Sequence, residues 1–387
     1  MPFIILAIGA ILLFLIRAAY FRKRALNNIV YKVHTDRHEV IEGDDIYLYE
    51  TIGNGKSMPL PNVRVDVCLP DGLDFCLYNK NGDMTTVSHM HNVESLFVLK
   101  PQAAVERRWR IRASRRGIYH LGEARMVVND IFGTNKLSAF YDAPKEEENT
   151  LTVLPRAIDL EEYFIPVSDP MGERTTDFSL ITDPILYAGS REYRPGDPMR
   201  RINQKATARM HYPMVDINEY TEQNSFDIVF NLQSRGREDV GDTPESREQV
   251  ELGVSVCASV FERALCENIP VRMICNTTSE NDDRDYFVSG YFSASSDNLE
   301  MLRMLAAIEM KLSCRIEDML GELLFENEKD PTCKNLVLIT SYIDETITDF
   351  ALRMMALGVE VIIFATSTLR SMPELPKELK VFYKTYK

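Results

Sequence analysis

The first part of the chain has the hydrophobic pattern of short β-strands. Between residues 29 and 150, apolar and polar positions alternate in short runs, and Gly, Asn and Pro residues separate these runs. Two examples are "DIYLYETIGNGKSMPLPNVRVDVCLPDGL" and "ERRWRIRAS". No apolar repeat of helical period lasts long enough to compete. Short strands at this spacing predict a β-sandwich of immunoglobulin-like type over residues 29–150.

The pattern changes in the C-terminal part of the chain. The apolar runs "FDIVFNLQ", "PVRMICNT", "KNLVLITS" and "VEVIIFAT" alternate with segments of helical spacing, such as "SREQVELGVSVCASVFERALCEN" and "TITDFALRMMALG". In the first of these segments Leu252, Val256, Val260 and Ala264 form one apolar stripe. Continuously apolar strands are typical of a parallel sheet covered on both faces. The alternation therefore predicts a doubly wound α/β domain.

The residues between these two regions are less regular. Residues 151–189 are rich in Pro, as in "IPVSDPMGERTTDFSLITDPILYAG", which predicts a connecting segment. After Pro213, the stretch "MVDINEY" alternates and is expected to pair with "FDIVFNL" across a turn at residues 222–225.

An apolar run opens the chain. Residues 3–21 are apolar apart from Arg17, and the basic cluster Arg22–Arg24 follows. A run of this length approaches the ~20 residues that span a bilayer, and charge placed after it puts the N-terminus outside and the main body in the cytoplasm. A cleaved signal peptide is the alternative, although its positive charge normally precedes the apolar run. The sequence predicts a single-pass cell-membrane anchor that contacts the lipid bilayer through residues 3–21.

The composition is that of a folded, acidic protein. The chain has 387 residues, of which 45% are hydrophobic and 26% charged, and its formal net charge is −14. The length fits two domains with additional segments. The acidic balance argues against nucleic-acid binding, which needs a broad basic surface. Its 7 cysteines include no C-x-x-C pair and predict free thiols rather than a disulfide framework.

Two local patterns resemble known sites but lack essential parts of them. The stretch "GNGKS" resembles the end of a phosphate-binding loop, yet Glu50 stands where that loop requires Gly, and we interpret it as a hairpin turn. His89, His91 and Glu94 resemble a metal site without a third cluster, and we interpret them as a surface loop. The α/β region has no G-x-G-x-x-G and no G-x-S-x-G. We therefore predict no catalytic residues and no cofactor.

A basic segment, "SREYRPGDPMRRINQKATARM" (Ser190–Met210), interrupts this acidic chain. Asp197 followed by Pro is typical of a helix start, so a helix of about three turns is expected after it. Arg201, Lys205 and Arg209 are spaced four residues apart and share one face of that helix. Like charges at this spacing repel by ~0.2–0.5 kcal/mol per pair, so negative groups are expected close to them.

Three interpretations of this basic face stay open. The cations pair with internal carboxylates, or they dock an acidic partner or a lipid headgroup, or they bind an anion or phosphate within an enzyme. The candidate internal carboxylates are Glu192, Asp197, Glu219 and Glu222. Charge alone does not separate the three.

The same segment resembles a family signature. The motif R-E-Y-x-P-G-D-P-M-R-R-I-N-x-K-A-T-A-R is similar to that of the domain-of-unknown-function-58 family, and "SRRGIYHLGEARMVVNDIFG" is similar to a second stretch of that family. The family usually has Trp where this chain has Gln204, and two N-terminal membrane spans where one is expected here. The signature positions are Arg191, Tyr193, Pro195, Gly196, Asp197, Arg200, Arg201, Ile202, Lys205, Ala208 and Arg209.

The resemblance implies a C-terminal domain like the von Willebrand factor A fold. It also implies partnership with AAA+ ATPases of the MoxR type, in systems that assemble or remodel complexes at the membrane. Factor A domains often bind Mg²⁺ through D-x-S-x-S after the first strand and an Asp after a later strand, because oxygen ligands suit this hard cation. The corresponding positions here are Asn231, Gln233, Arg235 and Ser341, so a degenerate site without metal is expected.

Together these features predict a non-enzymatic, membrane-anchored interaction protein that works with a MoxR-type AAA+ ATPase. A hydrolase or transferase with an unrecognised site near the membrane and an exported, adhesin-like binding protein are the alternatives. The predicted parts are an anchor (1–28), a β-sandwich (29–150), a connector (151–189) and the signature motif with the α/β domain (190–387).

Overall fold

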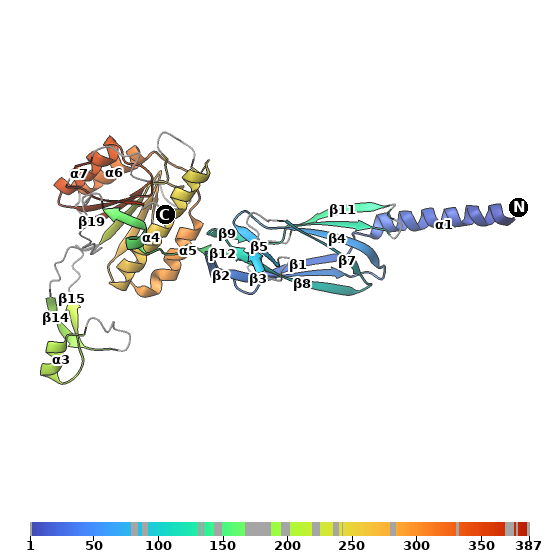
Figure 1. Cartoon of the computed structure of the whole chain (residues 1–387), viewed down its shortest axis with the longest axis horizontal. Coiled ribbons are helices and arrows are strands. Elements are labelled where there is room, and N and C mark those ends of the chain that lie inside the picture. Colours follow the sequence, from blue (N-terminus) through green and yellow to red (C-terminus); the bar gives the residue numbers. More distant parts are fainter. Residues whose placement is uncertain are drawn as a thin grey trace. The chain divides into compact units, whose positions relative to one another are not determined.

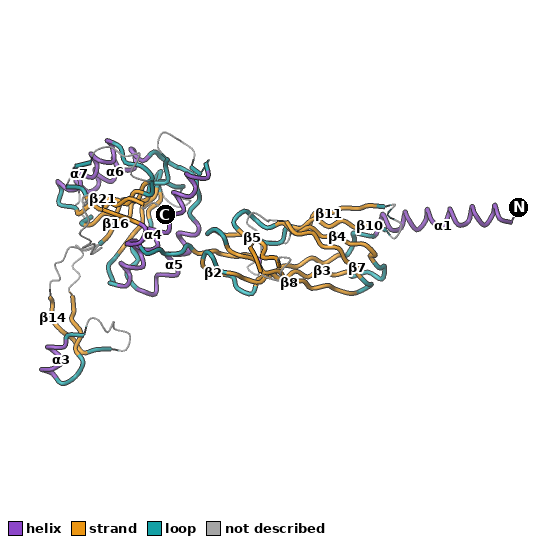
Figure 2. Tube along the Cα trace, in the orientation of Figure 1, coloured by secondary structure: helices purple, strands orange, loops and turns teal. Residues whose placement is uncertain are grey.

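The structure of the chain is a computed structural model. It divides into two compact units, one of Met1–Arg156 with Leu302–Ile308 and one of Ala157–Met301 with Glu309–Lys387. The fold is mixed α/β with several sheets (Figure 2). The structure describes residues 2–78, 84–86, 92–130, 133, 135–142, 149–166, 187–194, 202–218, 225–234, 240–241, 243–278, 284–329, 333–367, 375–376 and 378–384.

The first unit is built from strands that form three sheets. The strands are β1 (Ile29–Thr35), β2 (Glu39–Ile41), β3 (Asp45–Asn54), β4 (Leu60–Cys68), β5 (Leu73–Tyr78), β6 (Met84–Thr86), β7 (Asn92–Leu99), β8 (Ala103–Ala113), β9 (Gly117–His120), β10 (Ala124–Asn129), β11 (Lys136–Tyr141) and β12 (Thr150–Leu154). Their orders are β1-β3-β8-β5-β6, β11-β10-β4-β7 and β2-β12-β9. Neighbouring strands are antiparallel except β12 and β2, which are parallel.

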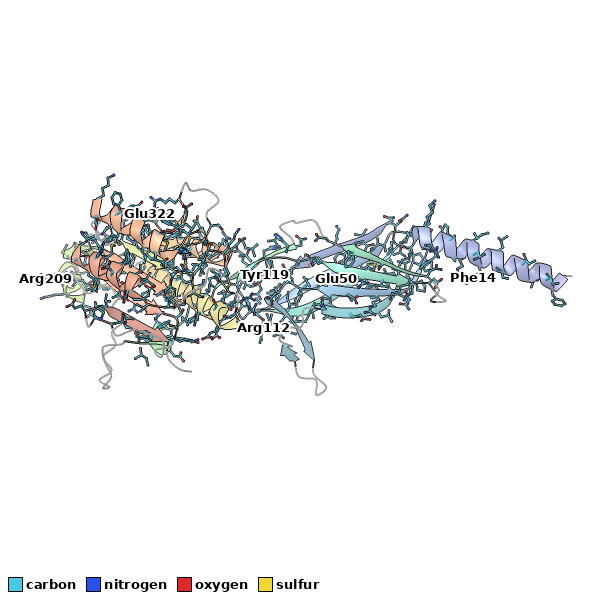
Figure 3. The ribbon with its side chains drawn as sticks, turned by 90° about the horizontal axis from the view of Figure 1, so that it is seen from above. Phe14, Glu50, Arg112, Tyr119, Arg209 and Glu322 are labelled. Atoms are coloured by element: carbon cyan, nitrogen blue, oxygen red, sulfur yellow. The ribbon has the colours of Figure 1, made fainter. Side chains whose placement is uncertain are left out.

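Strand β3 shows how the two-residue period builds the core of this unit. Ile46, Leu48 and Ile52 are buried, whereas Tyr47 and Tyr49, on the other face of the strand, are more exposed. Glu50 falls on the same buried face (Figure 3), where Arg107 and Trp109 of β8 donate hydrogen bonds to its carboxylate. The buried charge is therefore matched by an ion pair, as a charge in an apolar core requires.

Helix α1 (Pro2–Arg24) begins the chain, and its last turn packs on the first unit. Phe21 and Ala25 are buried there. The ammonium of Lys56 donates hydrogen bonds to the backbone oxygens of Ala25 at 2.6 Å and Asn27 at 2.7 Å. Lys56 belongs to "GNGKS", which connects β3 to β4. Its hydrogen bonds fix the residues that directly follow α1.

The predicted membrane anchor is wrong. Among the residues that the structure describes, no helix is long and apolar enough to cross a membrane. The physical reason is length. The uncharged part of α1, residues 3–16, rises about 21 Å at ~1.5 Å per residue, whereas a bilayer core is ~30 Å thick. Arg17 ends this part, and the end of α1 packs on protein instead. The predicted single-pass location in the cell membrane and its topology are wrong with it.

The second unit contains a seven-stranded sheet and a separate two-stranded sheet. The strands are β13 (Phe164–Pro166), β14 (Tyr187–Glu192), β15 (Met214–Asn218), β16 (Phe226–Phe230), β17 (Val271–Cys275), β18 (Phe287–Val288), β19 (Asn335–Thr340), β20 (Glu360–Ala365) and β21 (Lys380–Lys384). The helices of this unit are α2 (Leu160–Tyr163), α3 (Gln204–Met210), α4 (Pro244–Cys266), η3 (Ser295–Asp297), α6 (Ile316–Lys329) and α7 (Glu345–Ala356). Helix α5 (Asn298–Ala307) begins in this unit, and its residues from Leu302 onward belong to the first unit.

The large sheet has the order β13-β21-β20-β19-β16-β17-β18. Its inner strands β21, β20, β19, β16 and β17 are parallel, and the edge strands β13 and β18 are antiparallel to their neighbours. From β16 the chain moves to β17 on one side and later to β19 on the other. The strand order therefore reverses beside β16, as in a doubly wound sheet, and ligands bind such sheets at this point.

Helices cover both faces of this sheet (Figure 1). Val229 of β16 lies in one core cluster with Met319 of α6 and Phe350 of α7. On the opposite face Gly253 of α4 lies against Phe230 of β16 and Ile339 of β19. Burial on both faces explains why all five residues of β16 are buried.

The predicted pairing of "MVDINEY" with "FDIVFNL" is wrong. Strand β15, which lies in the first stretch, pairs with β14 in an antiparallel sheet, with Arg191 opposite Val215 and Glu192 opposite Met214. Strand β16, which lies in the second, has β17 on one edge and β19 on the other. A central strand has no free edge for a hairpin partner, which explains the difference.

The prediction of free thiols is confirmed. All cysteines are free, and Cys266 is the exposed one. Their positions are Cys68, Cys76, Cys257, Cys266, Cys275, Cys314 and Cys333.

Candidate functional site

The basic signature segment lies partly within the described residues. Arg191 is in β14. Tyr193 comes directly after this strand, and its backbone amide donates a hydrogen bond to the carbonyl oxygen of Pro213 at 2.9 Å. Ile202 forms an isolated antiparallel bridge with Val215 of β15. The segment thus contacts β15 near its start, through β14, and again at Ile202. The signature residues Pro195, Gly196, Asp197, Arg200 and Arg201 lie outside the described residues.

Helix α3 is shorter than predicted and starts at a different residue. Asn203 is its N-cap, with extended backbone (φ −78, ψ 98), and the Asn203 side chain accepts a hydrogen bond from the amide of Ala206 at 2.8 Å. His211 ends the helix in the left-handed conformation (φ 62). The extended Asn203 rules out one continuous helix from Asp197. The departure from the family pattern, Gln204, is the exposed first residue of α3.

Lys205 and Arg209 lie four residues apart on α3, and both are exposed (Figure 3 labels Arg209). Neither forms an ion pair with another residue that the structure describes, including Glu192. The other predicted carboxylate partners, Asp197, Glu219 and Glu222, lie outside the described residues. Within the described chain this pair of cations is open to solvent.

A second candidate site lies at the carboxyl ends of the parallel strands. Asn231 directly follows β16 and is buried. Its Oδ1 accepts hydrogen bonds from the amide of Gln233 at 2.9 Å and from Nδ2 of Asn276 at 3.0 Å, and its Nδ2 donates to Thr340 Oγ1 at 3.0 Å. Asn276 Oδ1 accepts from the amide of Leu232 at 2.8 Å. We call these side chains, of Asn231, Asn276 and Thr340, the edge network.

The remaining predicted positions lie beside the edge network. Gln233 Oε1 accepts a hydrogen bond from the amide of Ile316, the first residue of α6, at 3.0 Å. Ser341 Oγ donates to the carbonyl oxygen of Gln233 at 3.1 Å. Arg235 lies outside the described residues. The structure therefore brings together Asn231, Gln233 and Ser341, three of the four expected positions, as a group of neutral side chains.

The edge network does not fit a divalent cation. Mg²⁺ binds oxygen atoms whose lone pairs are free, preferably those of carboxylates. Here the Asn231 oxygen already accepts two hydrogen bonds, and the Thr340 hydroxyl accepts from Asn231 and donates to the Tyr342 carbonyl oxygen at 2.9 Å. The described residues contain no group of three or more His, Cys, Asp or Glu side chains that could hold a metal. The edge network instead joins the ends of β16, β17 and β19.

A buried ion pair stands near the other end of the same strands. Asp227 of β16 is 3% exposed, and Arg272 of β17 donates to its two oxygens at 2.7 and 2.8 Å. The Tyr291 ring centroid lies 5.0 Å from the guanidinium carbon. The hydrogen bonds to Asp227 raise the pKa of Arg272 above its usual value. This pair fixes the register of β16 and β17 and leaves no free charge.

Asn276, Thr340 and the Asp227–Arg272 pair were not predicted from the sequence. The position of Asn276 could have been predicted, because it is the polar residue directly after the predicted strand "PVRMIC". Carboxyl ends of parallel strands meet at one edge, so Asn276 and Asn231 could have been expected there together.

Comparison with known families decides the membership of this region. Residues 189–363 match the family described as "Protein of unknown function DUF58". This part of the chain belongs to DUF58. The match confirms the resemblance that the signature segment indicated, and the DUF58 region includes α3, the edge network and α6. No curated protein matches the chain.

Solved structures with detectable similarity include three proteins at low identity. They are α2-macroglobulin from Escherichia coli, from its MG7 domain to the C-terminus (14% identity, TM-score 0.24, 33% of this chain and 23% of that chain), a CARDB domain from Pyrococcus furiosus (12%, 0.19, 33% and 88%) and a non-cellulosomal cohesin from Archaeoglobus fulgidus (13%, 0.19, 30% and 94%). The chain thus spans less than a quarter of the macroglobulin chain. At these TM-scores none of the three bears on the function of the DUF58 region.

Proposed function

We propose that this chain is a non-enzymatic protein whose DUF58 region binds a partner protein, and that this partner is an AAA+ ATPase of the MoxR type. The edge network is the observation that supports a binding role over catalysis. The choice of partner rests on the resemblance of Ser190–Met210 to the family signature.

The argument from the edge network is chemical. A hydrolase or transferase needs a nucleophile beside a base, or a bound metal, within reach of its substrate. At the switch point of this sheet, Asn231 and Asn276 are uncharged and hydrogen-bonded to each other and to the backbone. Such groups hold strand ends together but activate neither water nor a hydroxyl. The chemistry of the edge network therefore supports a binding role for the surface of this domain.

Helix α3 offers one such surface. Lys205 and Arg209 are exposed, carry like charge and form no ion pair with a described residue. Two cations one helical turn apart suit an acidic patch on a partner, and complementary charge speeds association and favours the right partner. A complex formed through this face weakens as salt rises.

The test is binding between the purified full-length chain and a purified MoxR-type ATPase from the same genome, measured by biolayer interferometry with and without ATP. We expect a complex in at least one nucleotide state, and a Kd about tenfold weaker for Lys205→Glu/Arg209→Glu. The control, Lys32→Glu/Lys136→Glu, makes the same charge change at exposed residues of the first unit and should shift Kd less than about twofold.

Two results would contradict the proposal, one for each half. Absence of a complex in both nucleotide states would remove the ATPase as partner. Turnover of an ester, phosphoester or peptide substrate by the purified chain, abolished by a single substitution in it, would contradict the non-enzymatic role.

A further inference from the structure

The second family-like stretch of the sequence, Ser114–Gly133, lies outside the residues that match DUF58, and neither candidate site uses it. It begins with the turn from β8 to β9, whose sequence is "SRRGIY". Tyr119 of β9, which Figure 3 labels, holds this turn. Its hydroxyl donates to the carbonyl oxygens of Arg115 at 2.9 Å and Arg116 at 3.0 Å. We call residues 114–119 the arginine turn.

Two glycines make room for Tyr119 in the arginine turn. Gly117 has φ +146 and Gly72 has φ +112, and side chains other than that of Gly rarely allow such angles. A Cβ atom at Gly72 would collide with the Tyr119 hydroxyl. The amide of Arg115 donates to the Gly72 carbonyl oxygen at 3.1 Å. The backbone on both sides of Arg116 is therefore fixed.

The fixed turn directs Arg116 to the end of helix α5. Arg116 is 7% exposed, and its Nη1 donates hydrogen bonds to the carbonyl oxygens of Leu305 at 2.6 Å and Ile308 at 3.2 Å. All three residues belong to the first unit. The last carbonyl oxygens of a helix lack the amide partners of a continuing helix and carry partial negative charge. A guanidinium at this place therefore caps α5.

Other contacts hold the same end of α5. The side chains of Leu305 and Ala306 are buried. Arg303 donates to both carboxylate oxygens of Glu39, the first residue of β2. This ion pair is partly exposed, whereas Arg116 is nearly enclosed, and enclosed charge-assisted hydrogen bonds contribute more than exposed ion pairs. We therefore expect Arg116 to contribute most of the stability of this helix end.

We propose that the arginine turn is a latch for α5. The two hydrogen bonds of Arg116 keep the last turn of this helix formed, and their loss releases residues 305–308 while the rest of the chain stays folded. The latch gives the stretch that begins at Ser114 a function in the DUF58 region, because α5 lies within the residues that match this family. Helix ends are the parts of a fold that open most easily, so the latch is a place where the order of α5 can change.

The test is hydrogen–deuterium exchange of the full-length chain, measured by mass spectrometry on peptides that cover residues 302–308. Arg116→Met keeps an unbranched side chain but has no hydrogen-bond donor. In this variant we expect exchange in these peptides to be at least about tenfold faster. Peptides from β19 and α7 should exchange as in wild type, because the latch acts locally. Unchanged exchange at residues 302–308 would overturn the proposal.

Two further variants separate the latch from a loss of charge or of bulk. Arg116→Lys keeps a cationic donor and should hold exchange at residues 302–308 within about threefold of wild type. Arg115→Met removes the neighbouring guanidinium, which pairs with the exposed Asp71 at 2.9 Å, and should change this exchange less than about twofold. Equal effects of Arg115→Met and Arg116→Met would overturn the proposal.

Tyr119→Phe tests the latch without changing Arg116, and it serves if Arg116→Met does not fold. It removes only the hydroxyl that holds the arginine turn, so residues 302–308 should exchange about threefold faster or more, with α7 unchanged. Wild-type exchange at residues 302–308 in Tyr119→Phe would show that the turn does not control α5. Exchange that rises by one factor in every peptide would show a contribution to overall stability only, and it would also overturn the latch.

Discussion

Asn231 and Asn276 are joined by a side-chain hydrogen bond of 3.0 Å across the carboxyl ends of two adjacent parallel strands. Each residue directly follows its strand, and both are buried to 2% exposure or less. Doubly wound sheets normally place ligand-binding groups at this point. Here the same positions hold the strand ends together, so the edge network can be tested by stability.

Asn231→Asp should destabilise the fold. The substitution removes the donor to Thr340 and buries a carboxylate, one oxygen of which faces the Thr340 hydroxyl oxygen, whose own proton is donated to Tyr342. We expect a loss of about 2–4 kcal/mol in the free energy of unfolding near pH 7. Burial raises the pKa of the new carboxyl in the folded state, so the penalty grows as pH rises above the unfolded value of ~3.9 and is smaller below it.

The measurement is urea denaturation of wild type and Asn231→Asp at about pH 7 and about pH 4. Asn231→Ser is the control, because it introduces no charge and its deficit should not depend on pH. Equal stability of Asn231→Asp and wild type at neutral pH would show that the edge network contributes nothing.

Magnesium should not stabilise the wild-type chain. The oxygens of the edge network accept hydrogen bonds within the protein, and a cation would have to break these bonds to bind. A ligand present at 100 times its Kd stabilises a fold by ~2.7 kcal/mol, which shifts Tm by degrees. We therefore expect the same Tm by scanning calorimetry with about 10 mM Mg²⁺ and with chelator. A rise of several degrees would reveal a site that this geometry does not suggest.

The sequence predicted the regular part of the α/β unit well, because its apolar periods are strong. The patterns around Val256 and Val337 place α4 and β19 correctly, since a buried helix stripe and a buried strand leave clear patterns. Helix α6 was not predicted. Gly321 lies in its interior, and five acidic residues leave only a narrow apolar stripe at Met319, Leu320 and Leu323.

The candidate sites were predictable as positions but not as interactions. Asn231 was expected at a strand end from the pattern alone. Its bonds to Asn276 and Thr340 depend on the register of β16, β17 and β19, which no local pattern specifies. The predicted start of the signature helix at Asp197 was wrong for a related reason. Ile202 pairs with Val215, so tertiary contact overrides the local helix signal after Asp197.

The ion pairs of Asp45 predict how stability responds to acid. Arg112 donates to the Asp45 carboxylate at 2.8 Å and Arg110 at 3.1 Å. Hydrogen bonds from Arg112, and then from Arg110, hold the pKa of Asp45 below its usual value, although partial burial opposes the shift. Because the folded pKa is the lower one, this stabilisation is complete above the unfolded value of ~3.9 and is lost as pH falls through the folded value.

Arg110→Gln/Arg112→Gln should therefore be less stable than wild type near neutral pH, with a difference that shrinks in acid. Urea denaturation from about pH 7 down to about pH 3 measures it. The control is Arg353→Gln, which removes an exposed pair with Asp349 and should change stability by less than about 0.5 kcal/mol. A difference that stays constant over this range would contradict the role assigned to Asp45.

The Asp227–Arg272 pair predicts non-additive substitutions. Asp227→Asn leaves the partly buried guanidinium of Arg272 without a counter-charge and should cost up to about 3–5 kcal/mol of unfolding free energy. Asp227→Leu/Arg272→Met removes both charges and should cost clearly less than the sum of its single substitutions. A double-mutant cycle by urea denaturation measures the coupling. Additive costs would mean that the two charges do not depend on each other.

Two glycines on different helices of the DUF58 region should respond in opposite ways to the same added methyl group. A Cβ atom at Gly253 of α4 would lie 2.4 Å from Phe230 Cε2 and 3.5 Å from Ile339 Cγ2, so helix and sheet must separate. Gly253→Ala should lower the free energy of unfolding by about 1–3 kcal/mol through this overpacking, despite the better helix propensity of Ala.

Gly321→Ala on α6 is the matched control, because a Cβ atom there would meet nothing within 4 Å. Helix propensity alone then applies, and the variant should gain up to about 1 kcal/mol. Urea denaturation of both variants beside wild type separates the two effects. A gain at Gly253 would mean that α4 approaches the sheet less closely than the 2.4 Å contact requires. A loss at Gly321 would mean that the space beside α6 is filled by protein.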